Sequence, residues 1–304
     1  MIKKPIYRSL KRRACSMGFT RLVFPNGFLR KSPFLKTVSR FYAMSEDGFI
    51  GKLDGHRGVT VSSKTECCQN LEQFAKKLEV SLKKWTNEKL RSVWFEVHLS
   101  QADWISVLAK NGFTVHHGKG DLVNLVKWLP KDEKNVIPPF AHNTVGAGAI
   151  VINDKDEILT VQEKYADYTH WKLPGGYVEP LEDIGDAAQR EVLEETTIQT
   201  EFISVIAFRH SLQGNFGCSD IYFIVWLKPL THEISKEESE VKDCKWMNVQ
   251  EFINHPNVHE NNRLFVRTFL NHQKSGLRMT RQRMFHPISK KPQRVYLLTK
   301  VEDS

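Results

Sequence analysis

The sequence predicts an α/β protein in which a smaller α+β domain precedes a larger α/β domain. The first observation is an alternation of strand, helix and strand patterns after residue 140, which is typical of a sheet covered by helices. The second is a separate set of helix and strand patterns before a charged, proline-containing linker at 132–139. The chain has 304 residues, 40% of them hydrophobic, which is enough for two cores.

Residues 43–131 are predicted to form the smaller domain. Its patterns follow one another along the chain: a helix over 71–90, a strand over 93–99, a helix over 104–110 and a strand over 122–129. His116 and His117 are adjacent on a further extended segment. Because neighbouring side chains on a strand point to opposite faces, we expect structural or interface roles for this pair rather than a shared metal ion.

Residues 141–275 are predicted to form the larger domain, and 276–304 a basic tail. The domain's patterns are strands over 145–152 and 158–161 with a turn at 153–156, a helix over about 182–196, strands over 202–208 and 221–227, and short helices over 251–255 and 262–272. The first two strands and their turn predict a β-hairpin. In the tail, a short strand over 295–298 is expected to pack on one of the two domains.

A turn and a charged helix in the larger domain point to chemistry. The turn at Gly175 and Gly176 lets the backbone approach a ligand closely. Along the helix, Glu191 and Glu195 lie about 40° apart, with Glu194 on the flank. Three crowded carboxylates repel one another, and they suit a hard divalent cation such as Mg²⁺, which takes oxygen ligands and bridges phosphates.

An ordinary charged helix with a solvated face fits this pattern badly. Glu191 and Glu195 share a sector of the helix with Ile184 and Ala188, the side expected to face a core or a cleft. Arg190 precedes the flanking glutamate by four residues, so it can hold that carboxylate by charge-assisted hydrogen bonds.

These residues resemble the signature of Nudix hydrolases, which cleave nucleoside diphosphates linked to another group. Gly176, Glu182 and the block REVLEE at 190–195 fall at the family's spacing, whereas Thr197 stands where the family usually has Gly. The resemblance covers about residues 141–275 and implies an α/β/α Nudix sandwich.

The resemblance also implies a metal-dependent hydrolase with Mg²⁺ or Mn²⁺ as cofactor. Its substrates would be nucleoside diphosphate derivatives such as ADP-ribose, NADH or coenzyme A, cleaved at the pyrophosphate bond. The metal ligands that it maps onto the helix are Glu191, Glu194 and Glu195. A carbonyl oxygen of Gly175 or Gly176 is a further candidate ligand.

Three other residues complete the site that the resemblance implies. Glu182, at the start of the helix, is expected to join the metal cluster through a folding back of the loop. Arg190 is expected among the catalytic residues. Glu240, in the acidic loop at 235–241, is the favoured downstream ligand or base, and the alternative is a solvated loop residue.

The leaving group of the substrate is not readable, because the side motifs associated with NADH, ADP-ribose and coenzyme A hydrolysis are missing. Four aromatic residues are considered for stacking on a nucleobase, although core positions are favoured for them: Trp171, Phe208, Phe216 and Tyr222. Two other functions are alternatives. One is a non-catalytic nucleotide-binding module, suggested by Thr197, and the other is an RNA-processing Nudix protein.

The formal net charge of +9 is concentrated at the N-terminus. Residues 1–45 hold eleven basic residues and no acidic one, so the remaining 259 residues carry a formal charge of −2. This body lacks the basic groove expected for RNA, so nucleic acid is an unlikely partner. Residues 1–42 are therefore expected to be a mitochondrial transit peptide. The alternative is a disordered basic tail or a mistranslated upstream region, with the protein in the cytoplasm or nucleus.

Part of the smaller domain resembles the N-terminal domain of one Nudix subgroup, through 112–117 and 125–129. That subgroup is named for the antisense transcript of a fibroblast growth factor gene and has plant relatives. The resemblance implies half of an acetyltransferase-like fold, and we expect a homodimer through this domain. The expected partner is a nucleotide-derived small molecule rather than a membrane, since no run approaches about 18 apolar residues. The five cysteines lack zinc spacing and are expected to be reduced.

Overall fold

The computed structural model describes residues 48–166 and 168–300. The chain divides into two compact units between Asn135 and Val136, and each unit has its own core. The transit peptide predicted at 1–42 lies outside the described residues. Within the described residues, no helix is both long and apolar enough to cross a membrane.

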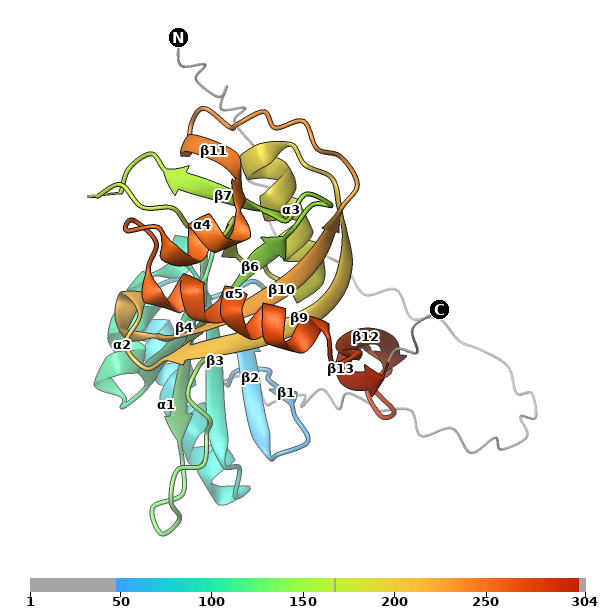
Figure 1. The fold of residues 1–304 in the computed structure, drawn as a ribbon. Coiled ribbons are helices and arrows are strands. Elements are labelled where there is room, and N and C mark those ends of the chain that lie inside the picture. Colours follow the sequence, from blue (N-terminus) through green and yellow to red (C-terminus); the bar gives the residue numbers. More distant parts are fainter. Residues whose placement is uncertain (1–47, 167, 301–304) are drawn as a thin grey trace, which may run out of the picture. The chain divides into compact units, whose positions relative to one another are not determined.

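The first unit contains a five-stranded mixed sheet (Figure 1). Its strands in spatial order are β1 (Lys52–Leu53), β2 (Gly58–Ser62), β3 (Ser92–His98), β5 (Leu122–Trp128) and β4 (Thr114–Lys119). β2 and β3 run parallel, and helix α1 (Leu71–Asn87) supplies the crossover that a parallel pair needs. The 3-10 helix η1 (Leu99–Gln101) and helix α2 (Asp103–Lys110) connect β3 to β4.

A single core holds the first unit together. Along β3, the alternate residues Val93, Phe95 and Val97 are buried, as expected for a strand with one covered face. Helix α1 buries Phe74 and Leu78, which are four residues apart and so lie on one side of the helix. The predicted helices and strands of this unit are confirmed to within a few residues.

A bulge in β4 corrects the expectation that His116 and His117 point to opposite faces, whereas the structural or interface role predicted for the pair stays a prediction. The pairing of β4 with β5 shifts register between Val115 and His117. An extra residue at a bulge breaks the strict alternation of faces along a strand. The Nδ1 atoms of the two imidazoles lie 2.7 Å apart, so the two rings meet instead of pointing to opposite faces.

The second unit is built on a six-stranded mixed sheet. Its strands in spatial order are β13 (Pro292–Lys300), β12 (Leu277–Phe285), β9 (Thr200–Ser211), β10 (Ser219–Pro229), β6 (Asn143–Val151) and β8 (Gly175–Tyr177). β6 and β10 run parallel, and β9 and β10 are antiparallel neighbours joined through the 3-10 helix η2 (Asn215–Gly217).

Helices cover both faces of this sheet. Helix α3 (Ile184–Thr196) shares a core with Ala147 and Ala149 of β6. Helices α4 (Val249–Asn254) and α5 (Glu260–Gln273) share a second core with Ile150 of the same strand, and Figure 1 shows α5 lying across β9 and β10. Because successive residues of β6 point to opposite faces, each face receives its own helix layer. The expected α/β/α sandwich is confirmed.

Strand β7 (Glu157–Glu163) does not form the predicted hairpin with β6. The turn forms as predicted, with the N–H of Asp156 donating to the carbonyl of Asn153, and one bridge joins Ile152 and Ile158. Beyond that bridge, β7 pairs antiparallel with β11 (Val241–Asn248) in a separate two-stranded sheet. The reason is that β10 and β8 occupy both edges of β6, so no edge is left for β7.

The basic tail forms a hairpin of β12 and β13 rather than one short strand. Met279 of β12 pairs with Val205 of β9, and its N–H donates to Oγ of Ser204 at 2.9 Å. The tail therefore extends the sheet of the second unit. The sequence pattern misses β12 because arginines interrupt the apolar alternation along it.

Candidate functional site

The two ends of helix α3 are fixed in different ways. At the start, the side chain of Asp183 is the N-cap and accepts a hydrogen bond from the N–H of Gly185 at 3.0 Å. At the end, Thr197 adopts a left-handed conformation with φ 62° and ψ 5°. This conformation is strained for a β-branched residue. The N–H of Ser235 donates to Oγ1 of Thr197 at 3.1 Å, which gives this side chain a compensating contact.

Arg190 is the centre of an ion-pair network on α3. Its Nε and Nη2 donate to the two carboxylate oxygens of Glu182 at 2.8 and 3.0 Å. Its Nη1 donates to Glu191 at 2.8 Å and to Glu194 at 2.9 Å, which confirms the predicted contact between Arg190 and Glu194. The hydrogen bonds from Arg190 lower the pKa of Glu182. Glu182 thus joins the other carboxylates through the guanidinium, and its predicted role as a metal ligand stays a prediction.

Glu191 and Glu195 are the two shielded carboxylates of the helix. Their side chains are 16% and 12% exposed, against 58% for Glu194, as the shared sector predicts. Glu195 accepts a hydrogen bond from the N–H of Gly175 at 2.9 Å and lies 3.9 Å from Nζ of Lys172. Burial raises the pKa of Glu191, and it raises the pKa of Glu195 to about 7.

Two glycines let the backbone of β8 meet these carboxylates. Gly175 has a φ of 149°, which other residues rarely adopt, and a Cβ there would lie 2.3 Å from the carbonyl oxygen of Ala147. A Cβ on Gly176 would lie 2.5 Å from Oε1 of Glu191. Both positions therefore require glycine, because the backbone lies too close to Ala147 on one side and to Glu191 on the other for a side chain. The N–H of Gly175 contacts the carboxylate of Glu195.

The donor atoms fit a hard divalent cation, although they do not form a ready-made cluster. Among the described residues, no three His, Cys, Asp or Glu side chains are placed to hold a metal ion. Glu191 and Glu194 are turned toward Arg190, and Glu195 toward Gly175. Carboxylate oxygens are the ligands that Mg²⁺ and Mn²⁺ prefer. Each of these contacts uses one oxygen of its carboxylate, so the second oxygen of each would be left for a cation while the present donors keep their places.

Glu240 lies on the loop before β11 and is exposed. Its N–H donates to Oε2 of Glu237 at 2.9 Å, and its carbonyl accepts from the N–H of Lys164 at 2.9 Å. In the part of the chain that the structure describes, no contact joins its side chain to the helix carboxylates. The loop does lie at the end of α3, because the N–H of Glu237 donates to the carbonyl of Glu195 at 3.3 Å. The role of Glu240 as ligand or base stays a prediction.

The cleft beside the carboxylates is lined by three residues that the sequence analysis missed, Glu163, Lys172 and Arg209, and by Tyr222, which it considered for base stacking. Lys172 donates to Glu163, and this hydrogen bond lowers the pKa of that carboxyl. The ring of Tyr222 lies over β6, where a Cβ on Gly148 would be 2.4 Å from its hydroxyl oxygen. The alternate glycines of β6 were a signal in the sequence that a ring lies over that strand.

The four aromatic residues considered for base stacking have different surroundings. Trp171 is buried, as favoured, and Tyr222 is half-buried in the cleft. The core expectation is wrong for Phe208 and Phe216, whose exposed fractions are 66% and 97%. Phe216 lies in the loop between β9 and β10, and Phe208 packs against Phe223 at 5.7 Å between ring centroids rather than under a helix.

Comparisons with known proteins place both units of this chain in one family. The family described as NUDIX domain matches residues 142–269, and the family described as Nudix hydrolase domain matches residues 49–129. The chain is 34% identical to Nudix hydrolase 8 of Arabidopsis thaliana over 263 residues, which cover 84% of this chain and 70% of the relative. It is 40% identical to Nudix hydrolase 2 of the same plant over 61% of this chain and 67% of the relative. It is 37% identical to human nucleoside diphosphate-linked moiety X motif 6, over 66% of this chain and 65% of the relative.

Proposed function

This chain belongs to the Nudix hydrolase family and is a pyrophosphohydrolase, and we propose that it acts on ADP-ribose, NADH, coenzyme A or a similar nucleoside diphosphate derivative with Mg²⁺ or Mn²⁺ as cofactor. One observation carries the proposal. The shielded carboxylates of Glu191 and Glu195 adjoin the Gly175–Gly176 backbone at the edge of a cleft that also contains Lys172. A human relative named for nucleoside diphosphate-linked moieties supports this substrate class.

The reaction transfers a phosphoryl group to water. The water oxygen forms a bond to one phosphorus, and the bridging P–O bond on the opposite side breaks. The electron pair of that bond leaves with the second phosphate, and the protons of the water pass to the phosphate products or to solvent, so a diphosphate diester gives two phosphomonoesters. A bound divalent cation supplies Lewis-acid polarisation of the phosphoryl oxygens and lowers the pKa of the attacking water.

The protein's own residues position these reactants. Glu191, Glu194 and Glu195 would hold the cation, and Arg190 keeps the first two carboxylates on one side of the helix. Lys172 lies 3.9 Å from Glu195, so its ammonium group would offset the negative charge of substrate phosphates bound beside these carboxylates. The N–H of Gly175 fixes the direction of the Glu195 carboxylate.

A substrate screen tests this proposal. The full chain is incubated with Mg²⁺ or Mn²⁺ and ADP-ribose, NADH, coenzyme A or a dinucleoside polyphosphate, and the phosphomonoester products are measured. We expect turnover of at least one compound and its loss on chelation of the metal. The absence of turnover with every compound and either metal would contradict the proposed substrates.

A second measurement reads metal binding without activity. A cation that binds only the folded state increases the free energy of unfolding by about 2.7 kcal/mol when its concentration is a hundred times Kd. The melting temperature rises as a consequence. We expect Mn²⁺ to stabilise the parent and to stabilise Glu195→Gln much less. Glu201→Gln, an exposed glutamate on β9, is the matched control and should behave as the parent.

We also propose that residues 1–42 direct the enzyme to mitochondria. The support is their basic, acid-free composition, with eleven basic residues in 1–45. Fused to a fluorescent reporter, these residues should carry it to mitochondria. A reporter in the cytoplasm or nucleus refutes the targeting and leaves the enzymatic proposal intact. The homodimer expected through the first unit is checked by sedimentation of the purified chain.

A further inference from the structure

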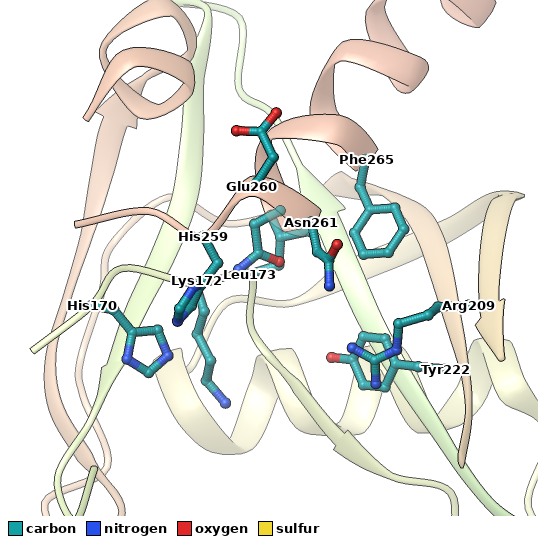
Figure 2. A pocket seen from close by; sticks show the side chains of 10 residues that line it. His170, Lys172, Leu173, Arg209, Tyr222, His259, Glu260, Asn261 and Phe265 are labelled. Carbon is teal, nitrogen blue, oxygen red and sulfur yellow. The ribbon is translucent and has the colours of Figure 1, made fainter. Parts of the chain in front are cut away.

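Two pockets adjoin each other in the second unit. The His170 pocket has a volume of about 460 Å³, and Figure 2 shows it between His170, His259 and Asn261. The Tyr177 pocket has a volume of about 380 Å³ and extends toward Tyr177 and the loop before β10. Both volumes fall in the range of roughly 300–1,000 Å³ that is typical of ligand pockets.

Three residues line both pockets: Lys172, Arg209 and Tyr222. The two pockets are therefore two arms of one cleft that meet at these side chains. The junction lies beside the proposed hydrolytic site, because Lys172 is 3.9 Å from Glu195 and Gly175 lines the Tyr177 pocket. A group bound at the junction is next to the carboxylates of α3.

Arg209 is held rigidly at this junction. Its Nη2 donates to Oδ2 of Asp220 at 2.6 Å, and its guanidinium carbon lies 5.2 Å from the ring centroid of Tyr222. These two contacts fix the plane of the guanidinium, which Figure 2 shows against the tyrosine ring. Asp220 is the hydrogen-bond partner of this guanidinium among the described residues, through Nη2, so Nη1 has no partner there, and the side chain is 38% exposed. A fixed guanidinium with unused donors matches the bidentate recognition of phosphate oxygens.

The His170 arm offers hydrogen bonds to a polyol rather than a second anionic site. Imidazoles of His170 and His259 and the amide of Asn261 line it above the apolar side chains Leu173 and Phe265. The acidic Glu260 on its rim is paired with two arginines of α5, and Figure 2 shows its carboxylate pointing away from the junction. Hydroxyl groups of a ribose or another sugar are the chemistry that these donors and acceptors fit.

We propose that Arg209 binds the diphosphate of the substrate at the junction, with one of the two moieties of the substrate in each arm. The enzyme then selects diphosphates that join two bulky moieties, one of them rich in hydroxyl groups, over nucleoside triphosphates. The nucleoside occupies the Tyr177 arm and the hydroxyl-rich moiety the His170 arm, so a triphosphate leaves the His170 arm to water and gains less binding energy in the transition state. This inference rests on the proposed function.

Arg209→Gln in the full chain tests the first part. The substrate is the diphosphate that the screen finds to be hydrolysed best, and kcat/KM is measured beside Arg209→Lys and the exposed control Arg283→Gln on β12. Removal of a positioned charged donor lowers kcat/KM on the order of 100-fold. Lysine restores part of the loss, because it keeps the charge without the planar fork, and Arg283→Gln matches the parent. An Arg209→Gln protein with the parent's kcat/KM overturns the inference.

Asn261→Trp tests the two arms independently and leaves Arg209 in place. Asn261 is exposed near the start of α5, so a larger side chain there fills the His170 arm without entering a core. For the diphosphate, kcat/KM should fall at least about 10-fold, as expected for lost pocket contacts. For ATP, kcat/KM, or its inhibition constant where turnover is undetectable, should be unchanged. Equal effects on both compounds, or none on the diphosphate, overturn the two-armed cleft.

The outcomes separate this inference from the function beneath it. A parent that hydrolyses none of the screened compounds overturns both. A parent that hydrolyses a diphosphate, with Arg209→Gln and Asn261→Trp as active as the parent, overturns the inference alone. A parent that prefers ATP to every two-moiety diphosphate also overturns the inference and leaves pyrophosphate hydrolysis standing.

Discussion

The two ends of helix α3 use acidic side chains for opposite purposes. At the N-terminal end, Asp183 accepts hydrogen bonds from Arg281 and from the Tyr296 hydroxyl, both on the C-terminal hairpin. Burial pushes the pKa of Asp183 upward, but these two hydrogen bonds, the charge of Arg281 and the hydrogen bond from the N–H of Gly185 together outweigh burial, so the pKa lies below its usual value. In the C-terminal half, burial dominates and raises the pKa of Glu191 and Glu195.

This difference separates stability from function along one helix. A carboxylate whose pKa is lowered is better stabilised in the folded protein than in the unfolded chain, so Asp183 stabilises the fold. A buried carboxylate whose pKa is raised is destabilised as an anion, so Glu191 and Glu195 reduce stability until a cation compensates them. The N-terminal end of α3 thus stabilises the fold through Asp183, and we call it the anchor end. The C-terminal half carries the carboxylates of the proposed active site, and we call it the site end.

The largest expected effect comes from Glu195→Gln, which removes a charge from the site end. Turnover should fall on the order of 100-fold or more, because the proposed cation loses a ligand. The melting temperature in the absence of metal should stay equal or rise, because a buried charge is gone. Enzyme assays and thermal melts on the same samples measure both. Glu194→Gln should lower turnover similarly, and parental activity in both variants would contradict the assignment of these carboxylates.

Asp183→Asn should give the reverse result at the anchor end. The amide keeps an oxygen for the N-cap but loses the charge that binds Arg281, which we expect to destabilise the protein by about 2 kcal/mol. Turnover below the melting temperature should stay within about threefold of the parent. Urea denaturation gives the stability change. The half-exposed Asp186 also binds Arg281, so Asp186→Asn is the control and should cost less. A catalytic loss in Asp183→Asn without a stability loss would break the division between the two ends.

Tyr296→Phe tests the stabilising role of Asp183 by removing one oxygen atom. The change removes the hydroxyl that donates to Asp183 at 3.0 Å and leaves the ring beside Phe202. One hydrogen bond to a carboxylate contributes about 1.5 kcal/mol, so a loss of that size should appear in urea denaturation. Tyr165→Phe, at an exposed position, should leave the stability unchanged. Equal stabilities for the two variants would show that the hairpin is anchored elsewhere.

The smallest effect is expected at Thr197, where the helix ends. Glycine would relieve about 1 kcal/mol of left-handed strain. It would also remove the hydrogen bond from Ser235, worth about 1 kcal/mol, and add entropy to the unfolded chain. We therefore expect Thr197→Gly to change the melting temperature by no more than a few degrees, with activity equal to that of the parent. A large rise would mean that the strain dominates, and a large fall that the Ser235 contact does.

Local features of the fold were predictable because their causes lie close together in the sequence. The helical spacing of Glu191, Glu194 and Glu195, and the contact of Arg190 with Glu194, follow from 3.6 residues per turn. The strands on either side follow from apolar runs. The turn before β7 was predicted from its residues, yet the pairing of that strand was not, since pairing depends on which edges other strands have already taken.

The sequence by itself determined the family, the sandwich and the helix that carries the carboxylates. Tertiary structure alone decided that Arg281 and Tyr296 reach back 98 and 113 residues to the start of that helix. It also brought Lys172 and Arg209 to one cleft. The physical reason is that periodicity reports the neighbours of a residue on its own helix or strand. Contacts between distant segments depend on how sheets and helices stack, and no local spacing records that stacking.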